Sequence, residues 1–244
     1  MAFCSLFLSA LMHIPKHIRR PPLYVCCAFA LLSVLLAIVF AVVAKIVSDS
    51  PRKLRVACVG DSTTWGTHAT RAEGVTYPDY LAKLGRRTLE VRNFGVGATT
   101  LLRRSGRAWC DTGELERAIA FQPDVVVIMF GVNEISHPDL LGEFLPDALW
   151  LVGRFKNAIP GLDVFLATPT PLAPGEEKHR ENTELRTKIM PDVRKVAQMA
   201  ECQMIEVNHD YPPTLGFLPD GVHPNAQGNR LIAQLVFNAI QPKE

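Results

Sequence analysis

Short apolar runs alternate with longer amphipathic segments from Leu54 to the end of the chain. The short runs have the length of strands, and the apolar residues of the longer segments recur at helical spacing. The last segment shows this spacing in Leu231, Ile232, Leu235, Val236 and Ile240. Because alternating strands and helices build parallel sheets covered by helices, this rhythm predicts an α/β fold.

The third apolar run, DVVVIMF at 124–130, has apolar residues at consecutive positions, as expected when helices cover both faces of a parallel sheet. We therefore predict one doubly wound, flavodoxin-like α/β domain with a five-stranded parallel sheet and helices on both faces. The expected strands are Leu54–Val59, Leu89–Phe94, Val125–Phe130, Val164–Ala167 and Met204–Val207. The expected helices are Tyr77–Leu84, Glu114–Phe121, Leu141–Ala158, Asn182–Ala200 and Ala226–Ile240. A proline-rich loop, Thr168–Glu177, is expected after the fourth strand.

The charge of the chain is nearly balanced, at +2 from 26 basic and 24 acidic residues. Nucleic-acid binding requires a basic field, so we expect no nucleic-acid partner. The cysteines of the body of the protein are too few and too scattered for a disulfide framework or a metal cluster. We expect Cys58 in the core and leave a Cys110–Cys202 bridge open. Metal-ligand spacing is also missing from His68, His137, His179 and His209.

The N-terminal part contains an uncharged segment of 22 residues, Leu23–Ala44. A helix rises 1.5 Å per residue, so this length matches a hydrocarbon core of about 30 Å. The sequence therefore predicts a single transmembrane helix through the lipid bilayer. The expected organisation is an N-terminal tail at 1–22, a transmembrane signal anchor at 23–46, a linker at 47–53 and the α/β domain at 54–244.

Basic residues flank the apolar segment on both sides, with a slight excess at 16–20 over 45–53, where Asp49 offsets part of the charge. The positive-inside rule then favours a cytoplasmic N-terminus and an extracytoplasmic or lumenal domain. The alternative is a cleaved signal peptide and a secreted protein, because residues 42–44 resemble a cleavage site. We favour the uncleaved anchor because the apolar run exceeds the usual length of a signal peptide.

Polar residues gather in loops directly after the expected strands, where ligands bind in doubly wound folds. Because parallel strands end at the same edge of the sheet, four separate loops should converge there. The four loop segments are Gly60–Ser62, Gly95–Gly97, Gly131–Glu134 and, before the last helix, Leu218–Gly228.

Ser62 lies at the turn from the first strand into a helix, where its hydroxyl can be exposed. A serine is a weak nucleophile unless a base removes its proton. His223 can supply that base, and Asp220, three residues earlier, can hold the imidazole Nδ1–H. This is the nucleophile, base and orienting acid of a hydrolytic triad.

An oxyanion hole could be formed by the Ser62 N–H, the Gly97 N–H and the side chain of Asn133. Asp61 is expected to fix the turn with its carboxylate. Trp65 either walls the acyl pocket or covers the core. An arginine group after the glycines either forms a solvated face or lies near the cleft, where it would favour acidic substrates; it comprises Arg103, Arg104 and Arg107.

At these four loops the chain resembles the SGNH (GDSL-type) hydrolases. The matching blocks, in order, are GDST at 60–63, NFGVGATT at 93–100, GVNE at 131–134 and DGVHPNAQG at 220–228. The resemblance implies Ser62 as nucleophile, His223 as base and Asp220 as its orienting acid. It also implies oxyanion donors at Ser62, a glycine and Asn133. Within the family, the chain looks most like the branch of carbohydrate and sialate O-acetylesterases.

Two positions depart from the family pattern. The glycine block is one residue short, so that either Gly97 or Gly95 could donate to the oxyanion; we favour Gly97. Glu134 stands where the family commonly has aspartate, and its longer side chain could shift a loop contact. The amide donor Asn133 is intact.

These features predict a membrane-anchored serine esterase that hydrolyses short-chain O-acyl esters of carbohydrates, without metal or organic cofactor. A lysophospholipase or thioesterase acting on lipid acyl esters would use the same triad. A sugar O-acyltransferase is compatible with the same acyl-enzyme. A catalytically inactive binding module is the alternative outside enzymes. The expected partners are an acylated sugar or lipid as substrate and the lipid bilayer through Leu23–Ala44.

Overall fold

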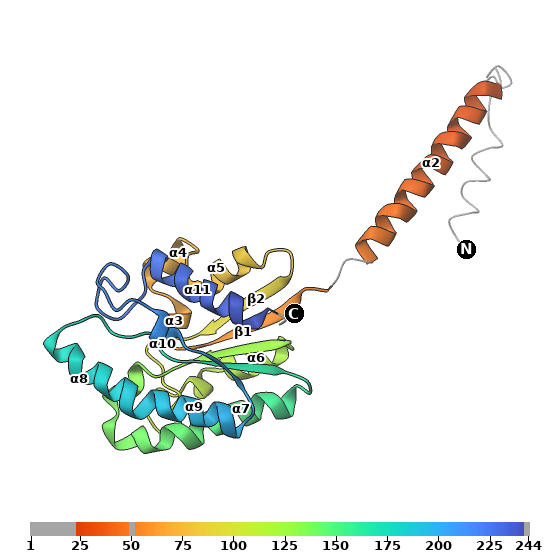
Figure 1. Ribbon diagram of the computed structural model, residues 1–244. Helices are drawn as coiled ribbons and strands as arrows, with labels where there is room; N and C mark the ends of the chain where they lie inside the picture. Colours follow the sequence, from red (N-terminus) through yellow and green to blue (C-terminus); the bar gives the residue numbers. More distant parts are fainter. Residues whose placement is uncertain (1–22, 49–51, 242–244) are drawn as a thin grey trace. The chain divides into compact units, whose positions relative to one another are not determined.

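The computed structural model describes residues 23–48 and 52–241. The chain divides into two compact units, Met1–Pro51 and Arg52–Glu244. Each unit is described by itself below, and the second contains all the residues expected to carry function (Figure 1).

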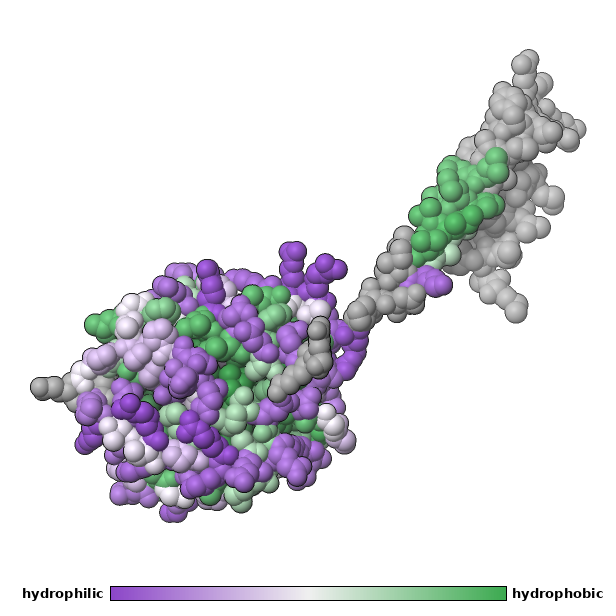
Figure 2. Space-filling model, in the orientation of Figure 1, coloured by the Kyte–Doolittle hydropathy of each residue, from purple (hydrophilic) through white to green (hydrophobic). Residues whose placement is uncertain are grey.

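The part of the first unit that the structure describes is helix α2 (Leu23–Ser48), which includes the uncharged segment. The side chains described in this helix are those of residues 31–42 and 45. Its apolar side chains are exposed, with Phe40 at 77% (Figure 2). Within the described residues, no helix is long and apolar enough to cross a membrane. The predicted membrane span therefore stays a prediction.

The second unit is built on a five-stranded, all-parallel sheet in the order β2-β1-β3-β4-β5. This is the flavodoxin-like order, and it confirms the predicted sheet. The order reverses beside β1, so the edge beyond the ends of β1 and β3 is the place where such folds bind ligands. The strands are β1 (Leu54–Gly60), β2 (Leu89–Gly95), β3 (Val125–Met129), β4 (Asp163–Ala167) and β5 (Gln203–Ile205).

Helices cover both faces of the sheet (Figure 1). One apolar layer joins alternate strand residues such as Val56 and Cys58 to α5 (Tyr77–Leu84) and α11 (Ala226–Ile240). The other layer joins Ala57 and Val59 to the helices on the opposite face. These helices are α6 (Glu114–Ala120), α7 (Phe144–Ala158) and α9 (Met190–Met199). Burial of β3 at every position fits its uninterrupted apolar sequence.

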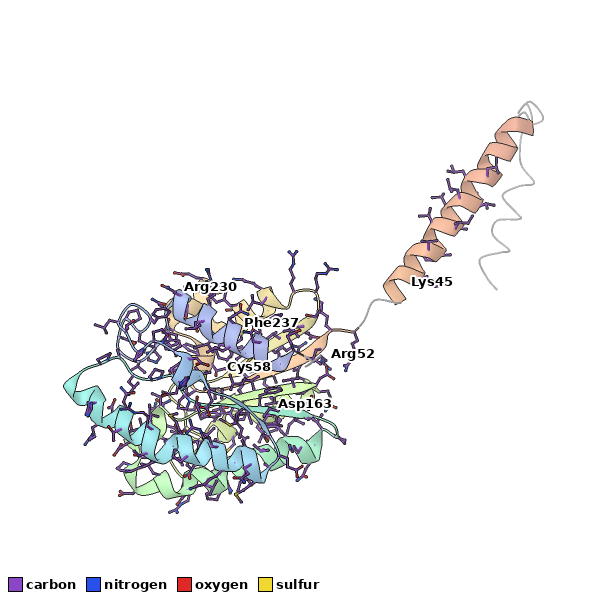
Figure 3. All side chains as sticks on the ribbon, viewed as in Figure 1. Lys45, Arg52, Cys58, Asp163, Arg230 and Phe237 are labelled. Carbon is purple, nitrogen blue, oxygen red and sulfur yellow. The ribbon has the colours of Figure 1, made fainter. Side chains whose placement is uncertain are left out.

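Cys58 lies buried in the sheet, as predicted (Figure 3). Cys110 and Cys202, for which a bridge was left open, are both free thiols. Among the described residues, no disulfide links the parts of the fold.

The predicted helix Asn182–Ala200 differs from the structure at its start and in its middle. Helix α8 (Glu176–Glu184) begins earlier and shortens the proline-rich loop, and a π-helical turn, Leu185–Ile189, separates it from α9. Pro191 follows this turn. Proline cannot donate the usual backbone hydrogen bond, and a π turn is one way to accommodate the missing bond.

Other boundaries moved for local reasons. The predicted start of the third helix at Leu141 is wrong, because a 3-10 turn at Pro138–Glu143 precedes α7. The predicted last strand is too long, because Val207 begins the short helix α10 (Val207–Asp210). The helix expected to follow the turn at Ser62 is present as the short α3 (Ser62–Trp65), and the short helix α4 (His68–Ala72) was not predicted.

Candidate active site

The chain turns sharply from β1 into α3, and this turn places Ser62 at the carboxyl edge of the sheet. A Cβ atom at Gly60 would lie 2.2 Å from Thr64 Oγ1 and 2.5 Å from the Met129 carbonyl oxygen, so only glycine allows the close turn. Asp61 caps α3 and accepts a hydrogen bond from the Thr63 N–H at 2.8 Å. The predicted turn-fixing role of Asp61 is thus seen directly.

Ser62, His223 and Asp220 meet at this edge although they lie far apart in the sequence. The His223 Nε2 atom is 3.0 Å from Ser62 Oγ, and His223 Nδ1 is 2.7 Å from Asp220 Oδ2. Both distances fall within hydrogen-bond range. The structure therefore brings together the nucleophile, base and orienting acid that the sequence predicted, in the order that proton transfer requires.

The Asp220 carboxylate is held by three hydrogen bonds from its own loop. Oδ1 accepts the Val222 N–H at 2.9 Å and the His223 N–H at 2.7 Å, while Oδ2 faces the His223 ring. Partial burial raises the pKa of Asp220, but these hydrogen bonds together lower it below its ordinary value. The carboxylate stays ionised and fixes the imidazole with Nε2 toward Ser62.

The hydrogen bonds in the structure distinguish between the two glycines, Gly95 and Gly97, that were candidate oxyanion donors. The Gly95 N–H donates to Asn93 Oδ1 at 2.9 Å, so it is already used within the loop. Gly97 lines the same cleft as Ser62 and His223, and among the described residues its N–H has no hydrogen-bond partner. These contacts favour Gly97 as the donor.

Asn133 begins the 3-10 turn Asn133–Ser136 that follows β3. One N–H of its side-chain amide donates to the Thr99 carbonyl oxygen at 2.8 Å and holds the amide against the glycine loop. A primary amide carries two N–H groups, so one remains for a developing negative charge. Asn133 does not appear among the residues that line the cleft in this structure.

The cleft around Ser62 is open and has a volume of about 530 Å³. This is within the range of small-molecule sites. Trp65 forms one wall, which settles its two expected positions in favour of the pocket, and its ring stacks with Arg71 at 4.7 Å. The other lining residues besides Ser62 and His223 are small: Gly66, Thr67, Val96, Gly97 and Ala98.

The arginines after the glycine block take different positions. Arg104 forms an ion pair with Glu143 at 2.6 Å, and Arg103 lies over the Trp150 ring at 4.6 Å. Both arginines are thus engaged by neighbouring surface side chains. Arg107 lines a neighbouring cavity of about 280 Å³ that also includes Gly97. Of these three arginines, only Arg107 therefore lines a cavity that includes Gly97, the favoured oxyanion donor.

A second buried acid, whose burial was not expected, lies next to the site. Glu134 is fully buried, its Oε1 accepts the Leu101 N–H at 2.6 Å, and its Oε2 has no hydrogen-bond partner among the described residues. Burial and, to a smaller extent, the nearby charge of Asp61 raise its pKa to about 8, although backbone hydrogen bonds such as that from Leu101 lower it. Burial also raises the pKa of Asp61, to about 6. No sequence signal distinguished this glutamate from a loop residue.

Among the described residues, no group of three or more histidine, cysteine, aspartate or glutamate side chains could hold a metal ion. The groups that meet at the site are a serine hydroxyl, an imidazole, a carboxylate and N–H donors.

A doubly wound sheet that carries a serine, a histidine and an aspartate in hydrogen-bond contact at its carboxyl edge defines the class as an α/β protein with the groups of a hydrolytic triad. The family model of the GDSL-like lipase/acylhydrolases matches residues 58–231. The chain belongs to this family, whose members hydrolyse ester bonds, as the four sequence blocks predicted.

Known relatives agree with this assignment. The chain is 28% identical over 210 residues to an acetylxylan esterase of Xylanibacter ruminicola, covering 77% of this chain and 43% of that protein. The chain thus spans less than half of that relative's length. Among solved structures, a variant of an acetyl xylan esterase from Geobacillus stearothermophilus aligns with a TM-score of 0.61 at 20% identity, over 78% of this chain and 97% of that one. An alpha/beta hydrolase from the metagenome of Lake Arreo, Spain, gives 0.59 at 20% identity, over 76% and 94%. These two structures share the fold.

Proposed function

We propose that the chain is a serine esterase that removes short acyl groups, such as acetyl, from carbohydrates. The observation that carries the proposal is the Ser62 Oγ to His223 Nε2 distance of 3.0 Å, with Asp220 on the other ring nitrogen, inside an open cleft. The acetylxylan esterase relative supports the acetyl and carbohydrate parts of the proposal.

In the proposed first half-reaction, Ser62 Oγ attacks the ester carbonyl and transfers its proton to His223 Nε2. Asp220 stabilises the imidazolium that forms. The carbonyl oxygen becomes an oxyanion and accepts hydrogen bonds from the Ser62 and Gly97 N–H groups and the Asn133 amide. The tetrahedral intermediate collapses, and the imidazolium gives its proton to the leaving sugar hydroxyl.

In the second half-reaction, water attacks the acyl group on Ser62 while His223 accepts the proton of the water. The acid leaves, and the proton returns to Ser62 Oγ. The small residues around the cleft, among them Gly97 and Ala98, suit a short acyl group next to Trp65. A lipid acyl chain would need a longer apolar surface than these residues provide.

Labelling with a fluorophosphonate probe tests the nucleophile directly. We expect the wild type to label and to hydrolyse p-nitrophenyl acetate, and Ser62→Ala to lose both, with turnover reduced by at least about 10⁴-fold. Ser136→Ala is the matched control, because Ser136 is exposed in a nearby loop. Wild-type protein that neither labels nor cleaves acetyl esters would refute the enzyme proposal.

The acyl preference is tested separately with a series of p-nitrophenyl esters and with acetylated xylo-oligosaccharides. We expect kcat/KM to be highest for acetyl and to fall as the chain lengthens. A maximum at long chains would indicate a lipid substrate. Acylated products formed when acceptor sugars compete with water would indicate acyl transfer.

The location of the protein is a proposal that rests on sequence alone. The 22 uncharged residues of Leu23–Ala44 support a single-pass N-terminal anchor with the Arg52–Glu244 unit outside the cytoplasm or in a lumen. Resistance of the full chain to alkaline carbonate extraction would support the anchor, and release into the soluble fraction would contradict it.

A further inference from the structure

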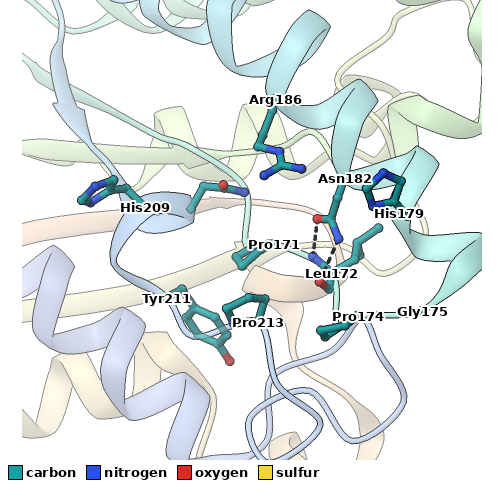
Figure 4. A pocket seen from close by; sticks show the side chains of 11 residues that line it. Pro171, Leu172, Pro174, Gly175, His179, Asn182, Arg186, His209, Tyr211 and Pro213 are labelled. Carbon is teal, nitrogen blue, oxygen red and sulfur yellow. Dashed lines mark hydrogen bonds between the residues drawn. The ribbon is translucent and has the colours of Figure 1, made fainter.

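A second cavity of about 410 Å³ lies beyond the carboxyl ends of β4 and β5 (Figure 4). Its walls come from three segments that are distant in sequence. These are the proline-rich loop at 171–175, helix α8 with its π-helical turn at 179–186, and the segment 208–213 around α10. The cavity shares no lining residue with the Ser62 cleft.

The cavity carries one unpaired positive charge. Arg186 extends from the π-helical turn toward the cavity in Figure 4 and makes no hydrogen bond or ion pair with another described residue. Its nearest acid in sequence, Glu184, pairs with Lys188 at 3.5 Å. None of the lining residues is acidic. His209 also lines the cavity, but its Nδ1 bonds to Asp210 at 2.8 Å. Arg186 is therefore a guanidinium that can receive an anion.

Hydrogen bonds hold the lining segments of the cavity to one another and to the proline-rich loop. The Asn182 side chain bonds to both the N–H and the carbonyl oxygen of Leu172, at 2.9 Å each, as Figure 4 shows. The Asn208 Nδ2 group donates to the Pro169 carbonyl oxygen at 3.0 Å. A preformed wall lowers the entropic cost of binding, because the loop is already ordered.

The same proline-rich loop contacts the catalytic loop. The Ala173 N–H donates to the Gly221 carbonyl oxygen at 2.9 Å, between Asp220 and His223 in the chain. Both cavities lie at the carboxyl edge of one parallel sheet, the first beyond β1 and β2 and the second beyond β4 and β5. A chain-like substrate with its ester at Ser62 can therefore extend along this edge into the second cavity.

We propose that this cavity binds the carboxylate of an acidic sugar residue in the acylated glycan whose ester is cleaved at Ser62. The inference rests on the proposed esterase function and narrows its substrate class to acidic, uronate-bearing glycans. A guanidinium pairs with a carboxylate through two parallel hydrogen bonds. One guanidinium neutralises one carboxylate, whereas a phosphate dianion would retain a negative charge. The exposed rings of Pro174 and Pro213 add apolar surface beside the charge.

The test compares two acetylated xylo-oligosaccharides that differ in one glucuronic acid branch. We expect the full chain to show a higher kcat/KM for the acidic substrate. Arg186→Gln should lower that value by about 10- to 100-fold, because a charge-assisted bidentate contact is lost. Cleavage of the neutral substrate should change less than about twofold, because Arg186 does not contact its ester.

Two further variants sharpen the comparison. Arg180→Gln is the matched control, since Arg180 is an exposed arginine of the adjoining helix α8 that does not line the cavity. Arg186→Lys retains the charge and loses the planar fork, so we expect an intermediate loss on the acidic substrate. If Arg186→Gln and Arg180→Gln have the same effect on the ratio of acidic to neutral cleavage, the inference is overturned.

A binding measurement keeps this inference separate from the esterase proposal. Titration calorimetry with the deacetylated, glucuronate-bearing oligosaccharide requires no catalysis, and we expect binding by wild type and Ser62→Ala that Arg186→Gln loses. Inorganic phosphate is the competing probe, and tighter binding of phosphate than of the oligosaccharide would overturn the carboxylate assignment. If wild type cleaves neither ester but binds the oligosaccharide through Arg186, the esterase proposal fails and the cavity assignment stands.

Discussion

Glu134 and Asp61 place two carboxyl groups in the protein interior beside the proposed nucleophile. An ionised carboxylate is costly to bury unless hydrogen bonds or charges compensate it. Glu134 has one such bond, from the Leu101 N–H, and an unpartnered Oε2. Burial raises its pKa from the ordinary value of 4.5 to about 8, so the folded protein keeps this side chain protonated at neutral pH.

Replacement of Glu134 by glutamine should therefore flatten the dependence of stability on pH. In the wild type the folded state retains the proton up to about pH 8, whereas the unfolded state loses it near 4.5. Across that window the free energy of unfolding should fall as pH rises, by up to about 1.4 kcal/mol per pH unit from this group. The glutamine side chain of Glu134→Gln does not titrate, and its oxygen can still accept the hydrogen bond from the Leu101 N–H. We expect it to exceed wild type in stability by a margin that grows from pH 5 to pH 8.

Urea unfolding at pH 5, 6, 7 and 8 measures this margin. Glu116→Gln is the control, because the Glu116 side chain is 63% exposed. A constant difference between Glu134→Gln and wild type at all four pH values would contradict a raised pKa at Glu134. The Asp61 carboxyl contributes in the same direction between pH 3.8 and about 6 in both proteins and does not change the sign.

At this scale, the sequence predicted the residues whose chemistry is visible in their type and spacing. His223 and Asp220 are three residues apart, and that spacing alone suggested the ring contact seen at 2.7 Å. The burial of Glu134 could not be predicted, because a polar residue after a strand is usually exposed. Its position depends on Leu101, which lies 33 residues earlier in the chain.

The loop after β2 packs so closely on α3 that its two glycines differ in what they tolerate. A Cβ atom at Gly95 would lie 2.3 Å from the Trp65 backbone nitrogen, a distance that real Cβ atoms do not reach. A Cβ atom at Gly97 would meet only the Trp65 ring, at 3.6 Å or more, which is ordinary contact. Gly95 is thus a packing position between β2 and α3, and Gly97 lies at the surface of the cleft.

We expect Gly95→Ala to destabilise the fold by about 1–3 kcal/mol, because the backbone of α3 must move. Gly97→Ala should change the free energy of unfolding by no more than about 0.5 kcal/mol. Thermal and urea unfolding of the two variants beside wild type measures both values. Equal destabilisation by the two substitutions would show that the loop does not pack as described.

Elements of regular length were predictable because their apolar periodicity extends over several turns. Helices α5 and α11 begin and end where the sequence predicted. The bounds of the short elements were not predicted, because four residues such as Ser62–Trp65 carry no measurable period. Their ends are set by capping at Asp61 and by close packing on β2, which are tertiary effects.

At the scale of the whole molecule, the two apolar layers that cover the sheet consist of residues from the Arg52–Glu244 unit alone. Arg52 itself belongs to this unit through its ion pair with Asp124 beside β3. The site residues and both cavities are also built from this unit. Folding and chemistry should thus depend on residues 52–244, and the N-terminal residues should matter for location.

A chain that begins at Arg52 should therefore retain the unfolding midpoint and the esterase activity of the full chain. We expect the free energies of unfolding of the two chains, measured in urea, to agree within about 0.5 kcal/mol, since no described core contact is removed. The kcat/KM for acetyl esters should agree within about twofold, because the Ser62, His223 and Asp220 contacts all lie within the retained residues. Arg52→Ala in the shortened chain is the control for the new terminus, because it removes the Asp124 ion pair, an exposed contact worth about 1 kcal/mol or less. A large loss of stability in the shortened chain, beyond what Arg52→Ala causes, would mean that residues before Arg52 support the catalytic unit.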